Sequence, residues 1–136
     1  GMASIRLGMA FSNPEIISFF NKVKYPYNIN LLTQRFVGEE IKKSARKNEW
    51  VEMLISQRSQ LQEQLKELPI IQRIYPTDAN FVLVRVNDAN ATYRYLVEQG
   101  IIVRNRNNVS LCNGCLRITV GTAEENKLLI EALKNM

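Results

Sequence analysis

The sequence predicts a mixed α/β (α+β) fold, with a small, mostly antiparallel or mixed sheet and helices packed on it. Three observations lead to this prediction. With 136 residues, 46% of them hydrophobic, the chain is long enough for one domain with a core and an incomplete extra element. Apolar residues follow helical spacing as far as Leu68, and short strand-like runs follow Pro69. The order is therefore helices, then β-β-α-β-β-α.

Helix signals dominate the first part of the chain. Asn13 and Pro14 form a helix start, with a capping side chain followed by proline at the first helical position. Pro26 ends this helix. The next helical pattern runs from about Leu31 to Leu68, which is long for one helix, so we expect a break at Gly38 or near Lys47–Asn48. The stripe that the first helix presents comprises Ile16, Ile17, Phe19, Phe20 and Val23.

Strand signals begin after Pro69. The run "IIQRIY" is a short strand that stops at Pro76, and "NFVLVRV" is apolar on both faces, as in a central strand. A helix capped by Asp88 then ends at Gly100, followed by a brief strand at Ile101–Val103. A polar loop leads to the strand "CLRITV".

The last helix has a strong start signal. In "TAEE", Thr122 caps the helix and Glu125 reaches back, which is the capping-box pattern. We expect the buried face of this helix to consist of Leu128, Leu129, Leu133 and Met136.

The composition argues against several classes of partner and site. The net charge of +5 comes from dispersed residues, which argues against nucleic acid as a partner. No apolar run is long enough to cross a membrane and no signal-peptide pattern is present, so we expect a cytoplasmic protein with no membrane partner. The chain contains no histidine, and the pair in "CNGC" lacks the further ligands that zinc needs, so we expect no metal site.

Three arginines are candidates for binding an anion. Strand alternation places the side chain of Arg117 on the other face of its strand from Leu116 and Ile118, away from the apolar layer. From there its guanidinium can clamp a carboxylate or phosphate. Arg104 ends the preceding predicted strand and approaches the same place if the two strands are neighbours. Arg6, in a turn beside a glycine, is a third candidate; surface arginines without a ligand remain the alternative for each.

Several stretches, in order, resemble the C-terminal part of histidinol-phosphate aminotransferases. These are fold-type I, class I/II enzymes that use pyridoxal 5'-phosphate. The resemblance covers essentially the whole chain, and its most specific element is "CLRITVGT" with the arginine thirteen residues before it. The matching stretches are "SIRLGMAFSNPEII", "PYNINLLTQ", "DANFVLVRV", "GIIVRNR" and "GCLRITVGTAEENKLLIEAL".

The resemblance implies a role for each candidate arginine. By position, Arg6 corresponds to the ligand of the cofactor phosphate, and Arg117 to the ligand of the substrate's anionic end. Arg104 corresponds to its partner in recognising histidinol phosphate. Residues 1–30 would be a remnant of the large cofactor-binding domain, and residues 31–136 the small C-terminal domain. The three arginines would then share one cleft.

The resemblance also implies what the sequence does not contain. The family's Schiff-base lysine, in a "SKAFG" stretch, would lie upstream of Gly1, so no catalytic residue is assigned here. We therefore expect the chain alone to be inactive and not to retain pyridoxal 5'-phosphate. The Gly-Met start is interpreted as the beginning of a truncated reading frame, although Gly1 could be native.

The activity implied for the parent enzyme is histidinol-phosphate transamination in histidine biosynthesis. It exchanges an amino group between glutamate/2-oxoglutarate and imidazole acetol phosphate/histidinol phosphate, in a homodimer. Two alternatives within this class are an aromatic aminotransferase and a phosphothreonine decarboxylase. An alternative outside it is a free-standing small-molecule-binding or interaction module without catalysis.

Overall fold

The computed structural model describes residues 3–136, so the prediction about the Gly-Met start lies outside the described residues. The chain divides into two compact units, one ending at Glu49 and the other running from Trp50 to Met136. The predicted boundary at residue 30 refers to domains of a complete enzyme and stays a prediction. The elements are η1 (Ala3–Ile5), α1 (Pro14–Val23), α2 (Leu31–Glu40), α3 (Ser44–Lys66), β1 (Ile71–Ile74), β2 (Phe81–Val86), α4 (Ala89–Glu98), β3 (Arg104–Asn105), β4 (Cys115–Thr119) and α5 (Ala123–Lys134).

The first unit consists of capped helices. The side chain of Asn13 accepts a hydrogen bond from the Ile16 amide at 2.9 Å, which confirms the predicted start of α1. Asn30 caps α2 in the same way, accepting from the Thr33 amide at 2.8 Å.

The break in the second helical pattern exists, but neither predicted position was correct. Gly38 lies inside α2 and Lys47–Asn48 inside α3, whereas the helices are separated by residues 41–43. In the break and beside it, Lys42 and Lys43 form ion pairs with Glu39 and Glu40. An isolated glycine is tolerated inside a helix at a modest cost, so Gly38 alone did not end α2. No helix among the described residues has the length and apolar character to cross a membrane.

The second unit contains a four-stranded sheet in the order β1-β2-β4-β3, with every neighbouring pair antiparallel. The prediction of a small, mostly antiparallel or mixed sheet with β2 in its centre is thereby confirmed, and the sheet is antiparallel throughout. The strand predicted at Ile101–Val103 is wrong: β3 is the next two residues, Arg104–Asn105. The side chain of Ile102 is 69% exposed, so this apolar run is not a paired, buried strand.

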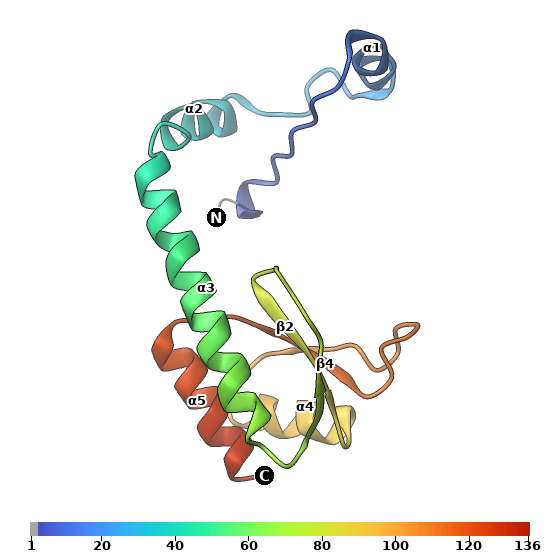
Figure 1. Ribbon diagram of the computed structural model, residues 1–136. Helices are drawn as coiled ribbons and strands as arrows, with labels where there is room; N and C mark the ends of the chain where they lie inside the picture. Colours follow the sequence, from blue (N-terminus) through green and yellow to red (C-terminus); the bar gives the residue numbers. More distant parts are fainter. Residues whose placement is uncertain (1–2) are drawn as a thin grey trace. The chain divides into compact units, whose positions relative to one another are not determined.

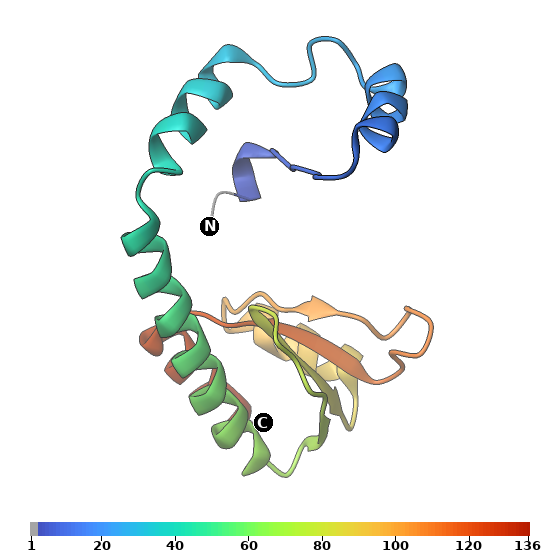
Figure 2. The same ribbon diagram turned by 45° about the horizontal axis from the view of Figure 1, so that its top comes forward.

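Helices cover one face of this sheet. In Figures 1 and 2, α4, α5 and the second half of α3 pack against it. Every second residue of β2 faces them and is buried, whereas the residues between are only half-buried. The core formed with the helices includes Leu61, Leu65, Val82, Val84, Leu96, Leu116, Ile118, Leu129, Ile130 and Leu133.

The caps of the last two helices match the prediction, but the buried face of α5 does not. Asp88 caps α4, and Thr122 and Glu125 form the capping box of α5. Leu128 and Met136 are exposed at 58% and 49%, contrary to the prediction. The buried positions of α5 are Asn126, Leu129, Ile130 and Leu133. This is an i, i+3, i+4, i+7 stripe that Leu128 falls beside.

Candidate functional site

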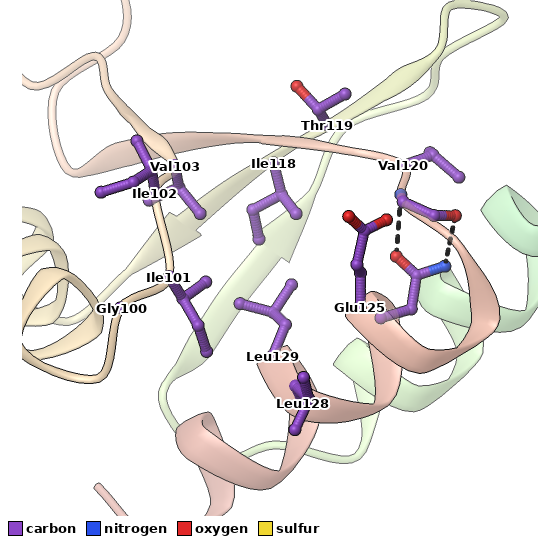
Figure 3. A pocket seen from close by; sticks show the side chains of 12 residues that line it. Gly100, Ile101, Ile102, Val103, Ile118, Thr119, Val120, Glu125, Leu128 and Leu129 are labelled. Atoms are coloured by element: carbon purple, nitrogen blue, oxygen red, sulfur yellow. Dashed lines mark hydrogen bonds between the residues drawn. The ribbon is translucent and has the colours of Figure 1, made fainter.

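Arg117 lies in the middle of β4, on the sheet face that the helices of the second unit do not cover. Its neighbours Leu116 and Ile118 are 1% and 2% exposed and point into the core, whereas Arg117 is half-buried on the other side. Figure 3 shows the same alternation one residue further, where Ile118 points toward Leu129 and Thr119 points away. The predicted orientation of Arg117 is therefore confirmed. We refer to this surface as the open face of the sheet.

Arg104 and Arg117 are directly opposed across β3 and β4. Opposed residues of neighbouring strands project from the same side of a sheet, so both side chains extend from the open face. The expectation that the two strands are neighbours is confirmed. Arg104 is exposed, and it begins β3 rather than ending a longer strand.

The surroundings of Arg117 favour an anionic ligand. Its guanidinium carbon lies 5.2 Å from the centre of the Phe81 ring, a cation–π contact that seats the group on the sheet. Its Nε is buried and has no hydrogen-bond partner. Within the described part of the chain, no ion pair involves Arg104 or Arg117. A carboxylate or phosphate would pair with the positive charge of these two guanidiniums through their accessible parts.

Sequence reasoning missed other members of the open face. Phe81 and Arg85 occupy alternate positions of β2, and Arg73 lies opposite Arg85 in β1. The alternation within "FVLVRV" was a usable signal for Arg85. The pairing of β1, β2 and β4 that places these residues beside Arg117 required the structure.

Arg6 belongs to the unit that ends at Glu49. It is exposed and has a φ of 59°, a left-handed conformation that is uncommon outside glycine. With the segment before α2 it lines a hollow of about 280 Å³, whose other residues are Ile5, Leu7, Asn28, Ile29, Asn30 and Thr33. The prediction that Arg6 shares a cleft with Arg104 and Arg117 stays a prediction.

A larger hollow, of about 400 Å³, lies between the end of β4, the segment Gly100–Val103 and α5 (Figure 3). Its lining is mainly apolar. At its polar end, Asn126 is held by two hydrogen bonds with Gly121, and Glu125 is engaged in the helix cap. None of the predicted site residues lines this hollow.

The two cysteines lie at the start of β4 and in the loop before it. Cys115 is buried in β4, and Cys112 is half-buried in the preceding loop; both are free thiols. Among residues 3–136, no group of three or more histidine, cysteine or acidic side chains is arranged to hold a metal ion.

Comparison with known proteins identifies the family. The family model "Aminotransferase class I and II" matches residues 1–133. The chain is 52% identical over 136 residues to a histidinol-phosphate aminotransferase of Parabacteroides distasonis, covering 100% of this chain and 39% of that protein. It is 53% identical to the Bacteroides fragilis protein of the same name, covering 98% of this chain and 39% of the relative.

The fold also matches solved structures. The crystal structure of the histidinol-phosphate aminotransferase from Clostridium acetobutylicum aligns with a TM-score of 0.83 at 25% identity, covering 90% of this chain and 38% of that one. The chain thus spans about two fifths of the length of the relatives it matches. On the match to residues 1–133, the chain belongs to the class I and II aminotransferase family.

Proposed function

We propose that this chain forms the substrate-recognition part of a histidinol-phosphate aminotransferase that uses pyridoxal 5'-phosphate. The observation that carries the proposal is the opposed pair Arg104 and Arg117, with the buried Nε of Arg117 unpartnered. The names of the relatives, at about 50% identity, support the same substrate. The reaction is amino transfer between glutamate/2-oxoglutarate and imidazole acetol phosphate/histidinol phosphate.

The donors around Arg6 fit the phosphate of the cofactor. The hollow beside Arg6 is lined by Arg6 and by the polar residues Asn28, Asn30 and Thr33, and no acidic residue lines it. Arg6 would pair with the phosphate through charge-assisted hydrogen bonds. Pyridoxal phosphate, when bound to the complete enzyme, supplies the electron sink for amino transfer. We assign no proton transfer to a residue of this chain.

The open face acts by positioning the substrate. Arg117 is held by the strand and by Phe81, so its donors keep a fixed direction. Arg104 approaches the same anionic group from the neighbouring strand. Two guanidiniums suit a phosphate, which offers several acceptor oxygens, and they also accept the carboxylate of glutamate in the other half-reaction.

The proposed assembly is a homodimer of the complete enzyme. Its support is the family to which the chain belongs. The first unit also exposes apolar surface, with Phe11 and Tyr27 89% and 97% exposed, which the rest of the same enzyme would cover as readily as a second protomer. Apolar area of this kind is typical of surfaces that are covered by further protein.

A chimera tests the proposal. The 136 residues replace the matching segment of the Parabacteroides distasonis relative, and amino transfer from glutamate to imidazole acetol phosphate is measured. We expect activity, and in Arg117→Gln a loss of at least about tenfold in kcat/KM for the phosphorylated substrate, because a charged hydrogen-bonded partner is removed.

The matched control is Arg94→Gln, which removes the same charge from an exposed position on α4. It should leave kcat/KM unchanged. An active chimera in which both substitutions have equal effects would contradict the role of Arg117. A folded chimera that does not catalyse amino transfer but decarboxylates phosphothreonine would favour the decarboxylase alternative.

A further inference from the structure

A second pair of arginines lies on the open face. Arg73 of β1 is directly opposite Arg85 of β2. Arg85 alternates with Val84 and Val86, which are buried beneath the helices, so Arg85 projects from the uncovered side. Because opposed residues share a face, Arg73 projects from the same side.

This pair carries uncompensated charge. Like charges directly opposite each other destabilise a sheet, and no ion pair within residues 3–136 involves Arg73 or Arg85. The Nε of Arg85 is buried and has no hydrogen-bond partner. A buried donor left unpaired costs free energy. Because this Nε is enclosed by protein, an oxyanion would meet the accessible part of the guanidinium, and the uncompensated charge of the two arginines is what favours an anion here.

The second pair shares its construction with Arg104 and Arg117. Each pair is opposed across two antiparallel strands, and each includes one arginine whose Nε is buried and unpartnered. Each also includes one guanidinium seated on an aromatic ring. Arg73 lies 4.8 Å from the centre of the Tyr75 ring, as Arg117 lies 5.2 Å from that of Phe81.

Gly114 lies beside the stem of Arg85. A Cβ built on this glycine would lie 3.5 Å from the Cγ of Arg85 and 3.5 Å from the carbonyl oxygen of Val86. Its φ of +72° is also one that side-chain-bearing residues rarely adopt. The methylene groups of Arg85 are therefore packed beside this turn, which restricts where its guanidinium lies.

We propose that Arg73 and Arg85 bind a second oxyanion, a carboxylate or phosphate, beside the Arg104–Arg117 pair. The site uses residues other than those of the proposed function and adjoins the Arg104–Arg117 pair. Arg85 is opposite Cys115 and Arg117 is opposite Leu83, so the two arginines are diagonal neighbours across β2 and β4. Diagonal neighbours have Cα atoms about 7–8 Å apart, which long side chains span. The oxyanion belongs either to a small molecule that bridges both pairs or to an acidic side chain of a polypeptide.

The test follows the arginine Nε–H signals of the 136-residue chain by NMR. Inorganic phosphate is added at constant ionic strength, with chloride as the balancing anion. We expect saturable shifts of the Arg85 and Arg73 signals. In Arg85→Gln the affinity reported by Arg73 should fall at least about tenfold, since a charge-assisted bond is lost. Arg73→Gln should weaken the Arg85 response in the same way.

Arg94→Gln is the control for net charge and should leave both responses unchanged. Backbone amide spectra establish that each variant is folded. Shifts of Arg85 that are absent, or that chloride alone reproduces, would overturn the proposal. The Arg117 signal is evaluated on its own. If phosphate shifts the Arg85 signal but not the Arg117 signal, the result counts against the proposed function and leaves the second site intact.

A second titration identifies the source of the oxyanion. Glutarate has two carboxylates and acetate has one. Saturable binding of glutarate at least about tenfold tighter than acetate, with the gain lost in both Arg85→Gln and Arg117→Gln, supports a bridging small molecule. Saturable binding of both at equal affinity supports a single carboxylate, as in an acidic side chain. Absence of saturable binding by either would overturn the proposal for carboxylates.

Discussion

The two units of the chain differ in what supports them. Residues 50–136 enclose a core in which Leu61, Leu65 and Leu96 are 0% exposed. In the other unit, α1 and α2 have no buried residue, although both are capped by asparagine. Its large exposed side chains include Met9, Phe11, Phe19, Phe20, Val23, Tyr25, Tyr27, Leu31, Leu32, Phe36 and Ile41.

This difference shows that the signals that start a helix are distinct from the packing that stabilises it. Caps and periodicity are sufficient to specify where helices begin, but short helices are marginal in water unless an apolar face is packed. The second unit therefore provides a rigid support for Arg104 and Arg117. The first unit carries Arg6 on helices and loops without a core of their own.

The largest difference between the two units is expected when one apolar side chain is truncated in each. Leu96→Ala removes a side chain that is 0% exposed and should lower the free energy of unfolding by about 2–5 kcal/mol. Phe11→Ala, at a position 89% exposed, should change it by less than about 0.5 kcal/mol. Urea unfolding followed by circular dichroism measures both. Equal effects would show that the first unit also contributes a core.

A glycine substitution gives the next largest effect. Gly114→Ala places a side chain at a φ of +72° beside Arg85 and should destabilise by about 1–2 kcal/mol. Gly8→Ala, where nothing lies within 4 Å, should change stability by less than about 1 kcal/mol. Thermal unfolding of the two variants provides the comparison, and a Gly114→Ala protein as stable as the wild type would contradict the conformation of this turn.

The capping box of α5 gives a smaller effect. Thr122 accepts a hydrogen bond from the Glu125 amide at 3.2 Å. Thr122→Ala should therefore cost about 1 kcal/mol. The equivalent change in the first unit, Asn30→Ala, removes a cap from a helix without a core. It should lower the helical signal of circular dichroism without moving the main unfolding transition, and a shift of that transition would count against independent units.

The smallest expected effect is a pH dependence at Glu125. The Thr122 amide donates to its carboxylate at 2.7 Å, and this bond and the Thr122 hydroxyl hold the pKa of Glu125 below its ordinary 4.5. The stabilisation is present above pH 4.5 and is lost as the pH falls through the lowered pKa. Wild type should lose more stability than Glu125→Gln as the pH falls from above 4.5 through the lowered pKa of this carboxyl, because only wild type has the group to protonate. Parallel stability curves would contradict this.

Much of the fold was predictable because its signals are local. The starts of α1, α4 and α5 follow from Asn13, Asp88 and Thr122, whose side chains bond to amides within the next turn. The exposure of Leu128 was not predictable, since it depends on how α5 packs on the core. The break at residues 41–43 contains neither glycine nor proline, so no local breaker signal marked it.

The candidate site was likewise predictable only where local signals determine it. Alternation within one strand gave the direction of Arg117. The opposition of Arg104 to Arg117 and of Arg73 to Arg85 depends on strand order and register. These are contacts between distant parts of the sequence, and the β1–β2 pairing also includes an irregular register between Ile71 and Arg73 that no local pattern signals.

The central claim is that Arg117 on the open face recognises the phosphate of the substrate. The most direct measurement is the Nε–H signal of Arg117 in the 136-residue chain, titrated with histidinol phosphate and, separately, with histidinol. Saturable binding of histidinol phosphate at least about tenfold tighter than histidinol, with the preference lost in Arg117→Gln and kept in Arg94→Gln, is the predicted result. Equal affinity for the two compounds, or a preference that survives Arg117→Gln, would contradict the claim.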